Sequence, residues 1–194
     1  ECNGRKFVGW TTDEILQPQD AVPNTLYVEK RNFPTIESDI TFYAVFAQEG
    51  TGDAKTVTDV LNRDLTGVTS TNTYSDWSGK TATSSAVYAG NSCGGNSSIQ
   101  LRSDKSSAGI ITTTSGGKAR KVTVAWNTST TQGRVLNIYG KNSTYSAVTE
   151  LYGNNAGTLI GNIKYGTSTE LIISDDYEYI GIRSNSGAMY LTSI

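Results

Sequence analysis

The feature that most constrains the fold is an alternation of apolar and polar residues that recurs throughout residues 98–194. In SIQLRS (98–103), KVTVAW (121–126), RVLNIYG (134–140) and YEYIGIRS (177–184), aliphatic side chains fall on every second position. A period of two is that of a β-strand with one buried face. TLIGNIKY (158–165), TELIIS (169–174) and AMYLTSI (188–194) add three more strand candidates.

Short runs typical of turns, SGGK, TTQG, YGNN and SNSG, separate these strands. No helix of ordinary length and no strand–helix–strand alternation fits the region. We therefore predict an all-β domain over residues 57–194, built as an antiparallel β-sandwich of the jelly-roll type. Its first residues, TVTDVLNRDL (56–65), fit either one helical turn or a first strand.

The first 47 residues have a different character and predict a small β module of their own. FVGW (7–10), TLYVEK (25–30) and ITFYAVF (40–46) are strand candidates, and Trp10 is the expected plug of their thin core. Residues 48–56, QEGTGDAKT, are small and polar, as in a linker. We predict a small β module at 1–47, a linker at 48–56 and the sandwich at 57–194.

Composition excludes several classes of function. The 194 residues carry a formal net charge of −2 and no basic run, so nucleic-acid binding is not expected. No stretch approaches the roughly 20 apolar residues of a membrane span, so we expect no membrane insertion of this fragment. The chain starts without Met or a signal-like segment, and we expect a processed or cloned fragment.

The residue types of common catalytic sites are also missing. The chain has no His, which removes the usual general base and the usual zinc ligand, and no G-x-S-x-G motif occurs. The only carboxylates to consider for glycoside hydrolysis are Asp175 with Asp176, Asp13 with Glu14, and Asp104; the first pair lies in a turn, where Asp commonly stabilises the backbone. We predict that the protein is not an enzyme.

Cofactor and disulfide predictions are correspondingly modest. Cys2 and Cys93 could pair in an oxidising compartment, although two separate thiols are favoured. We expect no cofactor and no metal. Ca²⁺ is conceivable through Asp and backbone oxygens, but no D-x-D-x-D loop supports it.

Two segments resemble known bacterial families. CNGRKFVGWTTDE followed by FPTIESDITFYAVFA resembles the second half of the Listeria–Bacteroides (internalin B-type) repeat, with matches at Phe7, Gly9, Trp10 and residues 43–45. That resemblance implies a small, partial β-grasp-like module at 1–47, used as a spacer or adhesive unit of bacterial surfaces. SGGKARKVTVAWNTSTTQGRVLNIYGKNSTY with YEYIGIRSNSGAMYLTSI resembles a secreted β-sandwich module of Bacteroidetes, similar in fold to galactose-binding-like modules. It implies a secreted or outer-surface location and raises the expectation of carbohydrate binding.

A ligand-binding face follows from the alternation. If the aliphatic side chains point inward, the opposite faces carry flat rings and planar hydrogen-bonding groups, the combination that sugars require. The predicted glycan-binding residues are Gln100, Arg102, Asn137, Tyr139, Tyr179 and Arg183. Tyr74 and Trp77 are a second candidate cluster, although Trp77 is expected to cover the core. The leading hypothesis is a non-catalytic glycan-binding or adhesion module with a glycan or surface protein as partner, and the alternative is a structural spacer without a ligand.

Overall fold

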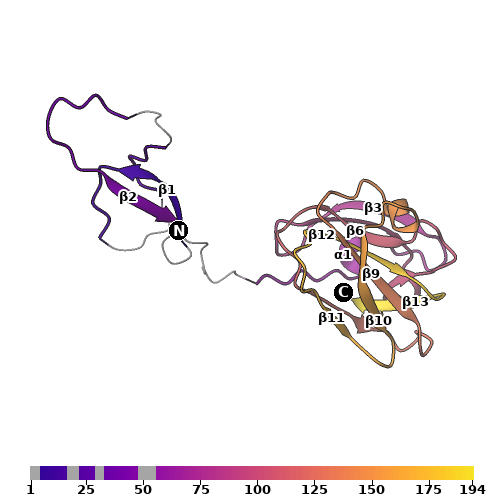
Figure 1. The fold of residues 1–194 in the computed structure, drawn as a ribbon. Coiled ribbons are helices and arrows are strands. Elements are labelled where there is room, and N and C mark those ends of the chain that lie inside the picture. Colours follow the sequence, from indigo (N-terminus) through magenta and orange to yellow (C-terminus); the bar gives the residue numbers. More distant parts are fainter. Residues whose placement is uncertain (1–4, 17–21, 29–32, 48–55) are drawn as a thin grey trace. The chain divides into compact units, whose positions relative to one another are not determined.

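The computed structural model describes residues 5–16, 22–28, 33–47 and 56–194 (Figure 1). The chain divides into two compact units, Glu1–Thr56 and Val57–Ile194. The predicted linker at 48–56 lies outside the described residues except for Thr56, and so does Cys2. No helix in the described ranges is long and apolar enough to cross a membrane.

The second unit is an all-β sandwich, which confirms the predicted fold class. Its larger layer is a six-stranded sheet in the order β10-β9-β12-β6-β4-β3, with all neighbours antiparallel. These strands are β3 (Ser75–Lys80), β4 (Val87–Ser92), β6 (Gly109–Thr114), β9 (Val135–Lys141), β10 (Thr158–Lys164) and β12 (Tyr179–Ser184).

The opposing layer consists of a three-stranded sheet, β5-β13-β8, and a two-stranded sheet, β11-β7. Its strands are β5 (Ile99–Leu101), β7 (Lys121–Thr123), β8 (Ala125–Trp126), β11 (Glu170–Ile172) and β13 (Met189–Ser193). Only Val124 separates β7 from β8, so one run of chain joins the two sheets. The chain crosses between the layers repeatedly, from β4 to β5, back to β6 and on to β7, as in a jelly roll.

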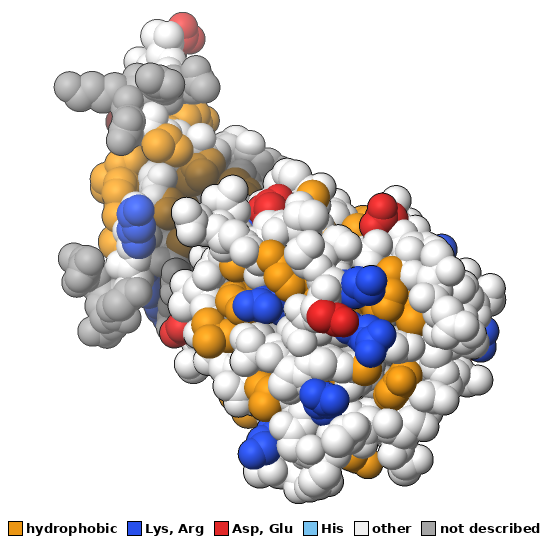
Figure 2. All heavy atoms as spheres, turned by 90° about the vertical axis from the view of Figure 1, so that its right-hand side faces the viewer, with side chains coloured by type: hydrophobic (Ala, Val, Ile, Leu, Met, Phe, Trp, Pro, Cys, Tyr) orange, Lys and Arg blue, Asp and Glu red, His pale blue; other side chains and the backbone are white. Residues whose placement is uncertain are grey.

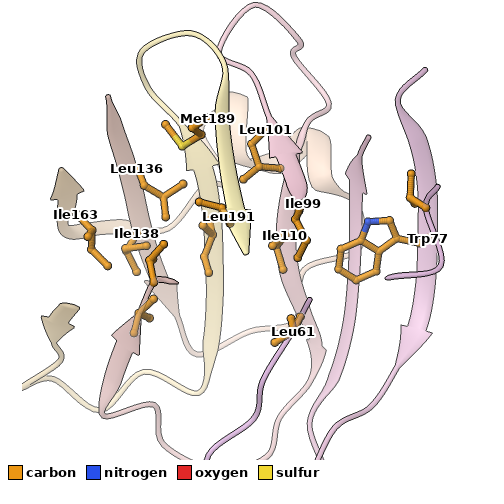
Figure 3. Packing of buried hydrophobic residues seen from close by; sticks show 14 of the residues in the cluster. Leu61, Trp77, Ile99, Leu101, Ile110, Leu136, Ile138, Ile163, Met189 and Leu191 are labelled. Carbon is orange, nitrogen blue, oxygen red and sulfur yellow. The ribbon is translucent and has the colours of Figure 1, made fainter. Parts of the chain in front are cut away.

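The core between the layers is made by the inward positions of the alternation. Leu136 and Ile138 of β9 face Ile99 and Leu101 of β5, and all four are buried (Figure 3). Figure 3 shows this cluster extending from Ile163 at one end to Trp77 at the other. Because these two residues lie on β10 and β3, the cluster spans the larger sheet from edge to edge. The predicted inward faces of β5 and β9 are thus confirmed.

The two tryptophans of the sandwich differ in burial. Trp77 is buried, donates from Nε1 to Ser92 Oγ at 3.1 Å, and lies flat on Gly90, where a Cβ would be 2.3 Å from the indole ring. Its predicted packing on the core is confirmed. Trp126 follows Val122 and Val124 on the inward face and packs against the core, but it is only partly buried. The reason is that β8 ends at Trp126, where the chain leaves the layer.

The sandwich begins with a short helical turn, α1 (Arg63–Thr66), which settles the alternative left open for residues 56–65. The Asn62 side chain caps it by accepting from Leu65 N at 2.9 Å, and Gly67 ends it with φ of 74°. Just before the turn, Leu61 exchanges two backbone hydrogen bonds with Ile194. The two ends of the second unit are therefore joined.

Asp59 attaches this entry segment to the connection between β3 and β4. Its carboxylate accepts from the backbone N–H groups of Thr83 (2.8 Å) and Ser84 (2.7 Å), from Ser84 Oγ (2.5 Å) and from Tyr88 Oη (2.7 Å). Burial alone would raise the pKa of Asp59, but these hydrogen bonds outweigh it and the pKa lies below its usual value near 3.8.

Replacement of Asp59 by asparagine is expected to lower the free energy of unfolding by about 1–2 kcal/mol at pH 7. Hydrogen bonds to a charged acceptor are stronger than neutral ones, and solvent access limits their effect here. Because the folded-state pKa is the lower one, the carboxylate's contribution is present above the unfolded value and is lost as the pH falls through the folded value. Urea unfolding at pH 7 and pH 3 should show the wild-type advantage shrinking at pH 3; an equal advantage at both would contradict this.

The first unit contains a two-stranded antiparallel sheet of β1 (Lys6–Thr11) and β2 (Tyr43–Ala47). The predicted third strand at 25–30 is wrong for its described part, residues 25–28. That part makes an isolated bridge between Tyr27 and Trp10, with N–H···O distances of 2.9 and 2.7 Å. Residues 25–28 thus meet β1 at a single residue pair, while the ladder of β1 with β2 has a register shift between Phe7 and Gly9.

The same register shift overturns the predicted role of Trp10. It places Phe7 and Trp10 on one side of β1, where their rings meet edge to face at 5.5 Å, and Phe7 meets Phe46 at 5.6 Å. Trp10 is 40% exposed and therefore does not plug a core. Tyr27, Phe33 and Phe42 pack their rings together instead.

Candidate functional site

The six predicted ligand residues do not share one surface. Gln100 and Arg102 belong to the smaller layer, at β5 and just after it. The other four, Asn137, Tyr139, Tyr179 and Arg183, lie on β9 and β12 of the six-stranded sheet. The structure thus brings together four of the residues in one place and two in another.

The predicted solvent exposure of the four residues on β9 and β12 is wrong. Tyr139 is only 8% exposed, Asn137 is buried, and Tyr179 and Arg183 are partly buried. The Tyr139 hydroxyl accepts from Arg183 at 3.0 and 3.2 Å and from Asn137 Nδ2 at 3.2 Å. The Arg183 guanidinium also lies 4.8 Å from the centre of the Tyr152 ring. These polar groups satisfy one another and form part of the packing.

The physical reason is a covering segment, residues 142–157, that connects β9 to β10 and contains η2 (Val148–Tyr152). Its side chains Tyr145, Val148 and Leu151 are buried in a second apolar cluster with Tyr139 and Ile111. Gly109 and Gly181 make room for it, because a Cβ at either position would come within 2.8 Å of Leu151. The outer face of the six-stranded sheet is therefore packed at β4, β6, β9 and β12 and is not free for a ligand there.

A partly buried ion pair holds the covering segment in place. Lys141 Nζ lies 2.6 Å from Glu150 Oε2, and the two side chains are 15% and 18% exposed. Glu150 Oε1 accepts from the backbone N–H groups of Ser146 and Ala147, and Lys141 also lies 3.9 Å above the Tyr145 ring. Burial opposes the charge on Glu150, but the contact with Lys141 and the two N–H groups lower its pKa overall.

Gln100 and Arg102 line a hollow of about 340 Å³ in the surface of the sandwich. Its walls come from the segment before β3, from the loop around η1 (Gly95–Ser97), and from the outward positions of β5 and β13. The lining residues are Thr71, Asn72, Gly95, Asn96, Gln100, Arg102 and Tyr190. Amides, a hydroxyl, a guanidinium and one aromatic ring therefore meet at a single site.

The register of the smaller layer places two of these side chains together. Tyr190 of β13 pairs directly with Gln100 of β5. Their sequence neighbours Met189, Leu191, Ile99 and Leu101 all point into the core. Because side chains alternate along a strand, Gln100 and Tyr190 are forced outward into the hollow. Gln100 is nevertheless buried by the η1 loop, so the prediction that it lies on an open face is wrong.

The Gln100 amide has a defined orientation. Its Oε1 accepts from the Cys93 thiol at 3.0 Å and lies against Gly95, where a Cβ would be 2.1 Å away. Only glycine fits at position 95 with the glutamine in this place. With Oε1 occupied by the buried thiol, the NH₂ end is the part of the amide left for a ligand.

The loop that carries Asn96 is strained and firmly attached. Asn96 (φ 52°) and Ser97 (φ 54°) both adopt the left-handed conformation that favours glycine. Asn127 Nδ2 donates to Asn96 O (3.1 Å) and to Ser98 Oγ (3.0 Å), and Gly94 N donates to Ser70 O. Strained residues that the surroundings hold in place occur preferentially at functional sites.

Two other residues that the sequence analysis considered, Asp176 and Tyr74, do not form a binding or catalytic site. Asp176 forms exposed ion pairs with Lys118 (2.7 Å) and Arg120 (2.9 Å), which lower its pKa. The Tyr74 hydroxyl is buried, has no hydrogen-bond partner among the described residues, and has a pKa raised by burial and by nearby Cys93. Within the described ranges, no group of three or more His, Cys, Asp or Glu residues is placed to hold a metal ion.

Sequence reasoning missed Thr71, Asn72, Asn96 and Tyr190. The signal for Tyr190 was present, because the alternation in AMYLTSI turns it outward between Met189 and Leu191. The GGNSS run predicts a turn at Asn96, but nothing local indicates that this turn folds beside Gln100. Thr71 and Asn72 arrive from a loop with no periodic pattern at all.

Comparison of the chain with protein-family models, with curated proteins and with solved structures finds no match.

Proposed function

We propose that the second unit is a non-catalytic glycan-binding module of a secreted or cell-surface protein, and that the hollow beside β5 and β13 is its binding site. The observation that carries this proposal is the lining of the hollow. Asn72, Asn96 and Gln100 offer planar amides, and Tyr190 offers a ring beside them. Sugar hydroxyls bind to planar amides, while the C–H face of a pyranose packs on an aromatic ring.

The size and support of the hollow favour binding of a short glycan segment. A volume of about 340 Å³ is at the small end of the roughly 300–1,000 Å³ typical of small-molecule sites. Gln100 is oriented by Cys93, and the Asn96 loop is attached through Asn127. Side chains held in this way lose little conformational entropy when a ligand binds.

The lining also favours binding over catalysis. Glycoside hydrolysis needs two carboxylates on either side of the scissile bond. Among the described residues that line the hollow there is no Asp, Glu or His. The groups that are present can bind and orient a sugar, but they do not form an acid–base pair.

The alternative function, a structural spacer, is favoured by a different observation. The covering segment 142–157 occupies the middle of the outer face of the six-stranded sheet, the broadest surface on which a sandwich could bind a polysaccharide. A spacer needs only stability and separate units. It predicts no affinity for any glycan.

Binding to an array of neutral and acidic glycans, followed by calorimetric titration of the best ligand, distinguishes the two functions. Replacement of Asn72 by alanine is expected to weaken binding by about 2–10-fold, the value of one neutral hydrogen bond. Asn154→Ala is the matched control, because Asn154 is exposed in the covering segment and does not line the hollow. If no glycan binds, or if both variants bind like the wild type, the hollow is not the site.

A further inference from the structure

Among the hydrogen-bonding groups that line the hollow, donors are more available than acceptors. Arg102 contributes only donors, and the Gln100 amide has its Oε1 engaged by the Cys93 thiol, which leaves its NH₂ hydrogens as its unused hydrogen-bonding groups. Asn72 and Asn96 can present their amide NH₂ groups to the same ligand, and no carboxylate is among the described lining residues. A site with surplus donors and one fixed positive charge matches a ligand that carries negative acceptors.

The guanidinium of Arg102 lies near the Asp104 carboxylate and remains partly exposed to solvent. Arg102 Nε lies 3.6 Å from Asp104 Oδ1, an ion pair longer than a hydrogen bond, and the arginine side chain is 44% exposed. The closest approach to the carboxylate is made by Nε, and the exposure of the side chain leaves room for a ligand at the guanidinium. Two parallel N–H groups of a guanidinium bind a carboxylate or a sulfate group in bidentate fashion.

The charge of the second unit agrees with an acidic ligand. Residues 57–194 contain eleven Lys and Arg against nine Asp and Glu, whereas the whole chain has a formal net charge of −2. On the face of this unit drawn in Figure 2, Lys and Arg side chains gather around few acidic ones, on a surface that is otherwise mostly uncharged. The small net positive charge of this unit therefore does not oppose binding of an acidic ligand.

We infer that the ligand of the hollow is an acidic glycan, with a uronate carboxylate or a sulfate ester bound by Arg102 and the Gln100 amide. This inference rests on the proposed glycan-binding function and adds the chemical class of the sugar. Arg102 supplies the charge-assisted contact, and Asn72, Asn96 and Tyr190 contact the rest of the ring. Asp104 limits the strength of the interaction by competing for the same guanidinium.

The test uses paired ligands that differ only in charge, titrated calorimetrically against the complete 194-residue chain at low ionic strength. One pair is tetragalacturonate and its fully methyl-esterified form; the other is a sulfated galactan tetrasaccharide and its desulfated form, which is neutral because galactan carries no carboxylate. We expect one acidic member to bind at least about tenfold more tightly than its neutral counterpart. The pair that shows this difference identifies the carboxylate or the sulfate as the bound group.

Three variants assign the effect to the site. Arg102→Gln should weaken binding of the acidic member about tenfold or more, and Asp104→Asn should strengthen it a few-fold by releasing the guanidinium. Lys105→Gln removes one positive charge from the same loop, outside the hollow, and should change affinity by less than twofold. An equal loss in Arg102→Gln and Lys105→Gln would show unspecific attraction and overturn the inference.

The outcomes also separate this inference from the proposed function. If charged and neutral members bind equally and Asn72→Ala weakens both, the hollow binds glycans but not through an acidic group. If none of the four ligands binds, the acidic-glycan inference is overturned, and the neutral members of the array decide the proposed function. Thermal melting of each variant should match the wild type, because Arg102 and Asp104 are exposed.

Discussion

Truncation of Trp77 to alanine is expected to lower the free energy of unfolding of the second unit by about 3–5 kcal/mol. Trp77 closes the β3 edge of the core, and its indole is buried against Gly90. Its removal leaves a cavity that the glycine cannot fill, because position 90 has no side chain. The Ser92 hydroxyl would also lose the donor that it now binds at 3.1 Å.

Trp126 provides the matched control for this prediction. It is the same residue type in the same unit, but it is only partly buried and donates to the Ser168 carbonyl at 3.2 Å. Its truncation should cost about 1–2 kcal/mol, less than half the effect at Trp77. Urea unfolding followed by tryptophan fluorescence and circular dichroism measures both; equal losses would mean that Trp77 does not close the core.

Replacement of Lys141 by methionine should destabilise the second unit by about 2–4 kcal/mol. The variant leaves the Glu150 carboxylate without its 2.6 Å partner in a partly buried site, and breaking a buried ion pair costs about 3–5 kcal/mol when solvent is excluded. Because Lys141 and Glu150 keep some contact with solvent, the expected loss of unfolding free energy is smaller than for a fully buried pair. The covering segment, which the pair holds on the sheet, should become sensitive to proteolysis first.

A double-mutant cycle tests whether the pair itself is responsible. Glu150→Gln alone should also destabilise, and the double variant Lys141→Met with Glu150→Gln should lose less than the sum, with a coupling of about 1–3 kcal/mol. Lys164→Met, at an exposed lysine of β10, should have little effect. Strict additivity of Lys141→Met and Glu150→Gln would refute the role of the ion pair.

The same pair has a predictable pH dependence. The pKa of Glu150 is lower in the folded protein than in the unfolded chain, where it is near 4.5. Its contribution is therefore present at neutral pH and is lost as the pH falls through the folded value. Below about pH 4, the difference between wild type and Glu150→Gln should diminish.

The fold class and the inward face of the sandwich strands could be predicted from the sequence. Leu136 and Ile138, or Ile99 and Leu101, can only lie on the same side of a strand, because successive side chains point to opposite faces. That rule is local and needs no knowledge of the partner strand. All four residues are buried in one cluster, on the faces that the alternation assigns to the core.

Only the tertiary structure decided what covers the outward face of each strand. Alternation separates two faces, but it does not determine whether the second face meets water or another part of the chain. Tyr139 points away from the core as expected, yet residues 142–157 fold over it and bury it. The spacing of Tyr145, Val148 and Leu151 indicates an apolar stripe, but the sheet that it covers is set by contacts distant in sequence.

The candidate site depends on such distant contacts throughout. Asn72, Asn96, Gln100 and Tyr190 come from segments far apart in the chain, and only the pairing of β5 with β13 and the folding of two loops brings them together. The amino-acid sequence by itself determined which side chains are available and which way each strand turns them. The tertiary structure decided which of them meet, because the free energy that closes long loops comes from the whole core and from no single segment.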